Sequence, residues 1–314
     1  MNYNVTGSAL ITVMLIMAIS TILLVANIQT SQSRVALETS LSRSAVANEL
    51  LFFAEGAALS HIQANLSEAT EDSRNTVMNK LSTTNEPLLV HESERYPGWL
   101  YEVRLIDLQA RININRTPYD TGYRNAIAAL LAQHGAYNTD TISDWIDTDR
   151  DAQGLGAEDN AYSRSHEGYL TANQSMVSAS EVSYIKDIPE GMWANIHHVV
   201  TALPQEARLN INTASTEVLD VMAPGVFFSD SVPREYANAT LSTSSEFSGL
   251  PHLVDVFVTS SEYFELEITI SKAPYIFITH SSLHVKPEDI DLIHRRPGFD
   301  LPIEKIFEVS HQKK

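Results

Sequence analysis

The sequence of 314 residues contains no cysteine, which excludes disulfide bonds, thiolate catalysis and cysteine metal ligands. Basic residues are scarce as well, since 21 Lys and Arg stand against 39 Asp and Glu and give a net charge of −18. A chain with this charge disfavours nucleic acid and suits cation binding. Glycine and proline, 12 of each, are too few for a collagen-like or low-complexity protein, and 44% hydrophobic residues are enough for a buried core.

The N-terminal region lacks charge altogether, because Met1–Ser33 contains no Asp, Glu, Lys or Arg. Within it, Ala9–Ala26 is an apolar run of 18 residues. As a helix, such a run is just long enough to cross a hydrocarbon core of about 30 Å. A cleaved secretory signal is the alternative, but the basic region before the run and the small-residue cleavage site after it are missing. We therefore expect a retained membrane anchor.

The helical pattern continues beyond this apolar run. Residues at steps of three or four form one mostly apolar stripe: Leu37, Leu41, Ala45, Asn48, Leu51, Glu55, Leu59, Ile62 and Leu66. The pattern predicts one helix from about Ala9 to about Leu66, in which a membrane segment continues as an amphipathic stem. Phe52 and Phe53 are expected to pack on a following domain.

Two strand pairs are predicted far apart in the chain. Leu88–Val90 and Leu100–Ile106 form the first, and Tyr263–Ile270 and Tyr275–Thr279 form the second, with a turn at 272–274. The residues between the two pairs carry helical signals. The simplest architecture is therefore an α/β unit with a helical domain inserted in its sheet.

Two helix starts are predicted in this middle region. Thr117 and Pro118, followed by Asp120, are typical of a start, and Ser178 with Glu181 has the spacing of a capping box.

A short motif occurs twice, as ARININ at 110–115 and as ARLNIN at 207–212, each time before a helical pattern. The structural interpretation is that the Asn side chains cap helix starts and shape strand-to-helix turns. The alternative is a helix-hairpin-helix module for nucleic acid, because INTASTEVLDVMAPGV at 211–226 resembles the opening of one. The segment 223–227 would be its hairpin, but no basic residue follows before Arg234. We therefore expect the shape to serve protein contacts.

The segment Asp140–Asp159 carries seven acidic residues and the single basic residue Arg150. Its alternating acids and a glutamate at the twelfth position have the ligand spacing of an EF-hand calcium loop: Asp147, Asp149, Asp151 and Glu158. The sixth position is Ala152, where an EF-hand has glycine. Oxygen ligands favour Ca²⁺ over Zn²⁺ or Cu²⁺. A solvated acidic turn is the alternative, and Asp144 is expected on a helix surface.

We do not expect an enzyme. His197 and His198 are adjacent, so their side chains point in different directions and chelate one ion poorly. The sequence has no G-x-S-x-G, no glycine-rich phosphate loop and no H-E-x-x-H.

Several motifs, taken in order, resemble one known family. The segment Gly7–Ile11 looks like a prepilin peptidase site, cut between Gly7 and Ser8, and Thr12 stands at the fifth mature position, where pilins usually have Glu. Further along, the chain resembles the minor pseudopilin K family of bacterial type II secretion systems in five segments: DLQARININ at 107–115, DWIDTD at 144–149, GAEDNAY at 156–162, TANQSMVSASEV at 171–182 and RLNINTASTEVL at 208–219.

The resemblance implies an α+β fold, with a long N-terminal helix packed on an antiparallel pseudopilin sheet and a large, mostly helical domain inserted in that sheet. The implied domains are the leader at 1–7, the transmembrane helix at 8–28, the stem helix and first part of the α/β domain at 29–112, the inserted helical domain at 113–258 and the second part of the α/β domain at 259–314.

The implied function is that of a minor pseudopilin at the pseudopilus tip, which helps to start assembly and export of folded proteins across the outer membrane. The implied partners are minor pseudopilins I and J, the pseudopilus, the inner membrane and the prepilin peptidase, which also methylates its substrates; no nucleic-acid partner is implied. The chain would cross the inner membrane once, with its C-terminal part in the periplasm. The resemblance also implies a structural Ca²⁺ held by Asp147, Asp149, Glu158 and Asp159.

Overall fold

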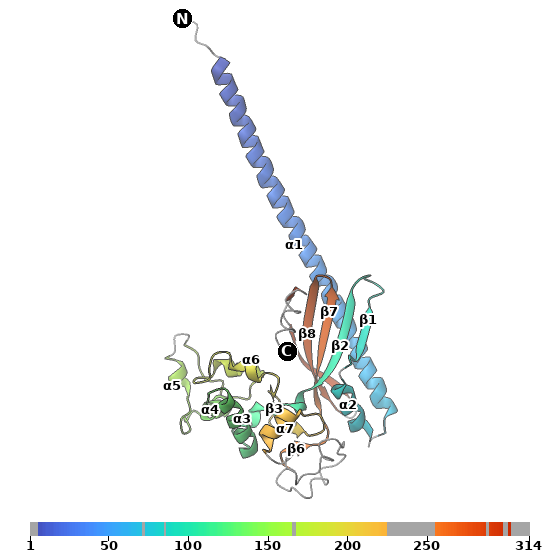
Figure 1. Ribbon diagram of the computed structural model, residues 1–314, viewed down its shortest axis with the longest axis vertical. Helices are drawn as coiled ribbons and strands as arrows, with labels where there is room; N and C mark the ends of the chain where they lie inside the picture. The colour runs from blue at the N-terminus through green and yellow to red at the C-terminus, as the bar shows by residue number, and fades with distance from the viewer. Residues whose placement is uncertain are drawn as a thin grey trace.

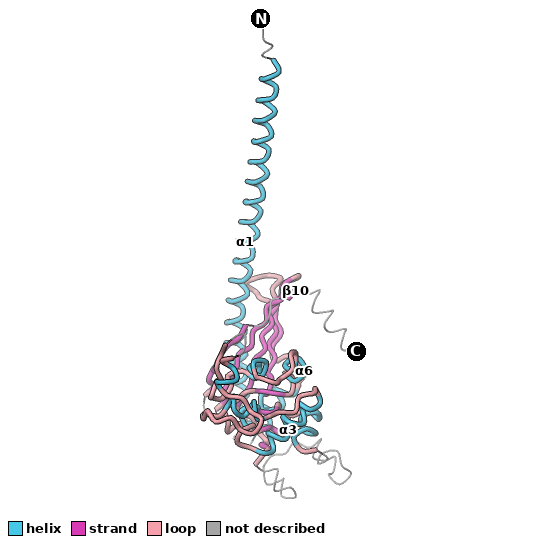
Figure 2. Tube along the Cα trace, turned by 90° about the vertical axis from the view of Figure 1, so that its left-hand side faces the viewer, coloured by secondary structure: helices cyan, strands magenta, loops and turns pink. Residues whose placement is uncertain are grey.

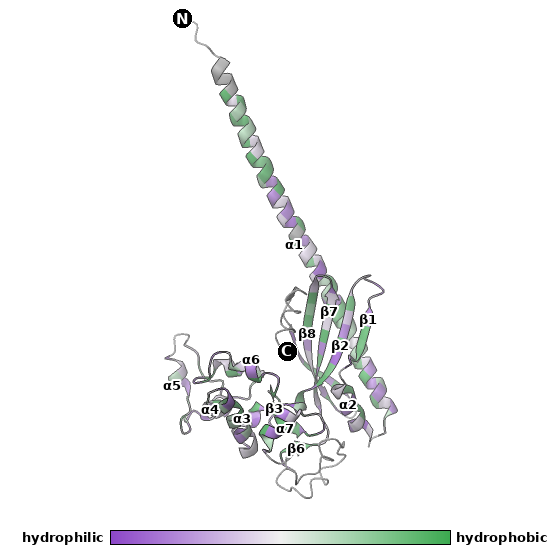
Figure 3. Cartoon of the chain, viewed as in Figure 1, coloured by the Kyte–Doolittle hydropathy of each residue, from purple (hydrophilic) through white to green (hydrophobic). Residues whose placement is uncertain are grey.

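The computed structural model describes residues 6–70, 73–84, 86–164, 168–224, 255–286, 289–297 and 301–302. A long helix, α1 (Thr6–Glu68), rises from a folded body at its far end (Figures 1 and 2). Its 63 residues correspond to about 95 Å of helix. The upper part of α1 is predominantly hydrophobic and the lower part mixed (Figure 3). The single long helix confirms the prediction of a membrane-type segment continued by a stem.

The predicted apolar stripe of α1 is buried in its C-terminal half and exposed in its N-terminal half. Its C-terminal half packs on the body, where Leu51, Glu55 and Ile62 are all buried. Its N-terminal half is uncovered, with Leu37 60% and Leu41 62% exposed. Phe52 and Phe53 contact the following domain as expected, since the Phe53 ring lies 5.8 Å from that of Tyr101 and the Arg295 guanidinium lies 5.1 Å from the Phe52 ring. The contact covers less than half of each side chain, because they are 57% and 60% exposed.

One antiparallel sheet forms the part of the body against α1. Its strand order is β1 (Leu89–Glu92), β2 (Leu100–Asp107), β7 (Tyr263–Lys272), β8 (Tyr275–Val285) and β10 (Leu301–Pro302), with β9 (Ile290–Pro297) also paired to β8. The two predicted strand pairs are therefore neighbours, although about 155 residues separate β2 from β7 along the chain. The last two strands of the sheet were missed by the sequence analysis.

The strand alternation explains how the sheet meets the helix. On β2, Tyr101, Val103 and Leu105 are buried, as predicted, and on β7 the paired Leu266 and Ile268 are fully buried beside them. These side chains form one core with the buried face of α1 and with Met78 of α2 (Arg74–Thr83). The period of two places the polar residues of both strands on the opposite face.

An ion pair between a buried carboxylate and a partly exposed arginine fixes the stem to the sheet. Glu55 of α1 is 4% exposed, accepts a hydrogen bond from Ser281 Oγ at 2.6 Å and is contacted by Arg295 Nε at 2.9 Å. Burial opposes ionisation of Glu55, but these hydrogen bonds outweigh it and lower the pKa of the carboxyl. Glu55, the charged residue of the stripe, thus has a structural role.

The middle region between β2 and β7 forms a second core, which Figure 1 shows to one side of the sheet. Its helices are α3 (Thr121–Gln133), α4 (Asp140–Ile146), α5 (Asp159–Tyr162), α6 (Met192–Ile196) and α7 (Thr216–Met222), with 3₁₀ helices η2 (Leu108–Ala110), η3 (Ile114–Arg116) and η4 (Ala179–Tyr184). Two short parallel pairs, which the sequence did not predict, join β3 (Ile112–Asn113) to β4 (Val200–Thr201) and β5 (Leu209–Asn210) to β6 (Phe257–Val258). With this helical middle region, the predicted α+β fold is confirmed.

The two predicted helix starts have different outcomes. The capping box of Ser178 and Glu181 is present, although it opens the 3₁₀ helix η4. The helix expected after Thr117 and Pro118 is present as α3, but it begins later, at Thr121, because Thr117 is the C-cap of η3. Asp120 is the residue that caps α3, since its side chain accepts from the backbone N–H groups of residues 122 and 123.

The joint between the sheet and the middle region is a buried polar network centred on Asp107. Its carboxylate accepts hydrogen bonds from Ser261 Oγ at 2.6 Å, Thr213 Oγ1 at 2.5 Å and Asn210 Nδ2 at 3.3 Å, and from the Gln109 backbone N–H at 2.8 Å. Burial raises the pKa of Asp107, against the effect of these bonds. Residues 107–109, 210–213 and 261 are thereby held at one point, where the chain leaves and re-enters the sheet.

The repeated motif turns the chain in both copies, and in the first copy Asn113 also caps a helix start, that of the 3₁₀ helix η3. Asn113 and Asn210 are buried, and each accepts a hydrogen bond from the backbone N–H two residues ahead, at 3.2 Å and 3.0 Å. Asn115 bonds to backbone groups of Met176 and Leu203. The side chains that start the following α-helices are other residues, including Ser215 for α7.

Candidate metal centre

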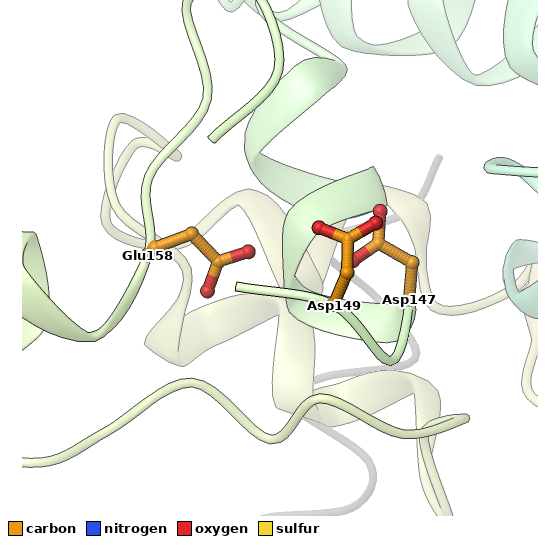
Figure 4. A group of neighbouring side chains, drawn as sticks. All are labelled: Asp147, Asp149 and Glu158. Carbon is orange, nitrogen blue, oxygen red and sulfur yellow. The ribbon is translucent and has the colours of Figure 1, made fainter. Parts of the chain in front are cut away.

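Three of the four predicted ligands meet at one end of the middle region. Asp147 follows the last turn of α4, Asp149 lies two residues further along, and Glu158 directly precedes α5. One carboxylate oxygen from each residue lies within 4.8 Å of the others. In Figure 4 the Glu158 carboxylate faces those of Asp147 and Asp149 from the opposite side. The first, third and twelfth positions of the EF-hand spacing therefore come together, whereas the fifth, Asp151, is not in the cluster.

The protein holds one oxygen of each carboxylate. Gln153 Nε2 donates to Asp147 Oδ2 at 3.1 Å, the Asp151 backbone N–H to Asp149 Oδ1 at 2.9 Å, and Thr171 Oγ1 to Glu158 Oε2 at 3.1 Å. The second oxygens of Asp147 and Glu158, Oδ1 and Oε1, are buried without a hydrogen-bond partner among the described residues. A buried carboxylate oxygen with no donor is costly, so these two atoms fit a cation ligand set.

Electrostatics agree with this interpretation. Asp147 and Glu158 are each only 7% exposed. Burial, followed by the charges of Asp149 and Asp144, raises the pKa of Asp147. Burial also raises the pKa of Glu158, together with the charges of neighbouring acids and against the Thr171 hydrogen bond. Without a cation, the ionised cluster is strained by both desolvation and like-charge repulsion.

Asp144 is a residue whose role the sequence analysis missed. It was expected on a helix surface, but it is fully buried and accepts hydrogen bonds from the Gln153 backbone N–H at 3.2 and 3.3 Å. Gly156 packs so closely that a Cβ there would lie 1.8 Å from Asp144 Oδ2. The missed signal was the Gly-x-Gly at 154–156, which allows the loop backbone to close over the last turns of α4.

Asp159, the fourth predicted ligand, lies beside the cluster rather than in it. Its Oδ1 lies 2.7 Å from Thr171 Oγ1, whose one proton is shared between Asp159 and Glu158, and accepts a hydrogen bond from the Thr171 backbone N–H at 3.2 Å. Its Oδ2 lies 3.9 Å from Arg150 Nε. The backbone bond anchors the loop that carries Thr171, and Thr171 in turn contacts Glu158.

The other candidate residues do not form a second centre. His197 Nδ1 contacts the Ala194 carbonyl at 2.9 Å, whereas His198 Nε2 faces Glu217 at 3.3 Å, so the two rings point to different partners. Most of the hairpin expected at 223–227 lies outside the described residues. The backbone of Gly7 and Ser8 belongs to the first turn of α1, which is the helix among the described residues that is long and apolar enough to cross a membrane.

Comparison with known proteins identifies a family model and several relatives that resemble this chain. Residues 110–205, which include the acidic cluster, match the family model for type II secretion system (T2SS), protein K. The chain is 34% identical over 136 residues to the type II secretion system protein K of Pseudomonas aeruginosa, covering 40% of each chain. It is 26% identical over 201 residues to that of Pectobacterium carotovorum subsp. carotovorum, covering 57% of this chain and 61% of the relative.

The sequence matches therefore span about half the length of the curated relatives. The fold extends the likeness: a chain in the crystal structure of the GspK-GspI-GspJ complex from enterotoxigenic Escherichia coli superposes with a TM-score of 0.62. That superposition covers 82% of this chain and 99% of the other, at 19% identity. Together, the family model, the curated relatives and the shared α+β architecture assign this chain to the type II secretion system protein K family.

Proposed function

We propose that this chain is a minor pseudopilin at the tip of the type II secretion pseudopilus, where it helps to start fibre assembly and the export of folded proteins across the outer membrane. The observation that carries the proposal is the uncovered apolar face of the stem. Leu37, Leu41 and Phe52 lie at helical spacing on α1 and are all more than half exposed, although they follow the membrane-type segment. An apolar stripe of this kind is typical of a surface that packs on another helix.

The shape of the molecule supports a terminal position. The middle region lies to one side of the sheet, far from the α1 axis (Figure 1). In a fibre whose subunits stack along their N-terminal helices, a side body of this size would clash with the next subunit. Thr12 supports the same position, because a carboxylate buried in the bilayer is costly unless a neighbouring subunit pairs with it. A subunit at the tip has no neighbour above it, and Thr12 carries no charge.

The proposed partners are minor pseudopilins I and J, because the related Escherichia coli chain was crystallised in a GspK-GspI-GspJ complex. In this proposal the prepilin peptidase cuts between Gly7 and Ser8 on the cytoplasmic side. Residues 8–28 cross the inner membrane once, and the body lies in the periplasm as part of the secretion machinery rather than as an enzyme.

We further infer a structural Ca²⁺ at the acidic cluster. Asp147, Asp149 and Glu158 would supply hard oxygen ligands, of the type that calcium prefers. Asp159 would contribute through Oδ2, since Thr171 contacts only Oδ1. The cation would supply charge neutralisation to a loop that no disulfide holds, and the residues of this chain already fix the carboxylates in place.

The test of the proposed function is association with its partners. Full-length chain carrying Leu41→Glu would be co-expressed with pseudopilins I and J of the same organism and co-purified in detergent. Ser42→Glu is the matched control, because it adds the same charge to the neighbouring exposed position. We expect Leu41→Glu to reduce recovery of I and J at least tenfold and Ser42→Glu to leave it unchanged. Equal recovery with both variants would exclude this stem face as the partner surface, and absence of I and J from the parent preparation would refute the function.

A further inference from the structure

A cleft of about 390 Å³ separates the outer face of the sheet from the middle region. The sheet contributes Glu265 and Glu267 of β7, His280 of β8 and Arg296 of β9, and the middle region contributes Arg111 and Trp193. Four histidine side chains in all line the cleft. Clefts of this size between structural units are the usual place for small-molecule sites. The metal centre lies elsewhere, since none of its residues lines this cleft.

One acidic side chain in the cleft is already neutralised. Glu265 is 3% exposed, and its two oxygens contact His280 Nδ1 at 3.0 Å and Arg296 Nη2 at 2.8 Å. Burial opposes its ionisation, but the His280 hydrogen bond and the Arg296 charge prevail and lower the pKa of Glu265 to about 2. Glu265 therefore remains ionised and satisfied, and it needs no ligand.

Of the two arginines that line the cleft, Arg296 pairs with Glu265, whereas Arg111 pairs with no residue in the described part of the chain. Its side chain is half-buried and makes no hydrogen bond or ion pair with any residue in the described ranges. The backbone at this residue is held in place, because the Arg111 N–H donates to the Leu108 carbonyl and the N–H of the next residue donates to the Val199 carbonyl. Burial lowers the pKa of this guanidinium, which reflects its loss of solvation. A planar guanidinium that pairs with no carboxylate among the described residues presents donors suited to two oxygens of one anion.

We propose that this cleft binds a small molecule carrying a phosphate or carboxylate group, whose oxygens are held by Arg111. Trp193 and the apolar side chains of the cleft would contact the body of the ligand. Glu267 also lines the cleft and makes no ion pair with a described residue, so it weakens the attraction for an anion. A ligand seated there would touch both the sheet and the middle region.

The test uses the full-length chain in non-ionic detergent micelles, titrated calorimetrically with inorganic phosphate and, separately, with malonate at constant ionic strength. The two titrations distinguish a phosphate site from a carboxylate site. Arg111→Gln should weaken binding of the preferred anion at least tenfold. Glu267→Gln should strengthen it several-fold, because it removes a negative charge from the cleft wall. Arg104→Gln is the matched control, since Arg104 lies on the same sheet, pairs with Glu102 and does not line the cleft.

The opposite signs of the two cleft variants make the test independent of folding defects. If Arg111→Gln is recovered poorly, Glu267→Gln still has to tighten binding relative to Arg104→Gln. Failure of both anions to bind in the millimolar range would overturn the proposal. Equal affinities in the Arg104, Arg111 and Glu267 variants would overturn it as well, since binding would then be unrelated to the cleft.

Discussion

The double change Asp147→Asn and Glu158→Gln should reverse the order of stability of the parent and the variant, depending on calcium. In chelator, the variant should be at least as stable as the parent, because its neutral amides avoid the desolvation and repulsion that raise the pKa of both carboxyls. In calcium, the parent should be more stable, because its ionised oxygens bind the cation and the amides bind it poorly.

The size of the effect follows from two quantities: the cost of burying two carboxylate oxygens without a donor, and the stabilisation of the native state by bound calcium. Asp147 Oδ1 and Glu158 Oε1 are buried without a donor among the described residues, and each such group costs about 1–3 kcal/mol. Calcium at a hundredfold excess over its Kd stabilises the native state by about 2.7 kcal/mol. For a folded region of this size, that corresponds to a rise in Tm of about 5–10 °C.

The pH dependence has a definite sign. A raised native pKa means that the native state holds more protons than the unfolded state, so the free energy of unfolding falls as pH rises. In chelator this fall should begin above the ordinary pKa values of 3.8 for Asp147 and 4.5 for Glu158. Calcium competes with protons for the same oxygens, so saturating calcium should remove the fall.

The assay is thermal unfolding of the full-length chain in detergent, measured in chelator and in millimolar calcium. Asp151→Asn is the matched control, because it makes the same chemical change in the same loop at an exposed residue outside the cluster. We expect the control to keep the calcium shift of the parent. The reasoning is refuted if the parent melts at the same temperature in chelator and calcium, or if the double variant keeps the full shift.

Three further predictions concern the helix. The mature protein should begin at Ser8, and Gly7→Ala should be cut poorly; mass spectrometry of the assembled protein would contradict this by finding Met1. Thr12→Val should preserve pseudopilus assembly, whereas Thr12→Glu should cost at least about 2.5 kcal/mol in the bilayer unless paired; loss of secretion by the Val variant, at normal protein level and cleavage, would count against the tip position. Arg295→Ala should lower the free energy of unfolding of the body by about 2–3 kcal/mol, because it leaves the Glu55 carboxylate buried without its counterion. The expected loss is smaller than for a fully buried pair, because Arg295 is partly exposed and solvent screens its charge. An unchanged midpoint in denaturant unfolding would show that the pair does not fix the stem.

Features that depend on neighbouring residues in the chain could be predicted from the amino-acid sequence alone. The uncharged apolar run and the three-to-four spacing beyond it predicted one continuous helix, because helical periodicity is a local property. Alternation on β2 predicted which side chains are buried, and Ser178 with Glu181 predicted a capping box. Three metal-cluster residues were predictable from EF-hand spacing, because all three lie within twelve residues of the chain.

Tertiary structure decided what depends on residues far apart in the chain. The stripe on α1 gives no sign of where it stops covering its own sheet, so the exposure of Leu37 and Leu41 follows only from the position of the body. From the sequence, Glu55 only interrupts the apolar stripe, because its partner Arg295 lies 240 residues later in the chain. The motif beginning at Asp107 acts as a joint only because Thr213 and Ser261 meet it in space. Likewise, Arg111 pairs with no residue of the described ranges because sheet pairing places Glu265 with Arg296 and His280, an arrangement that local sequence does not encode.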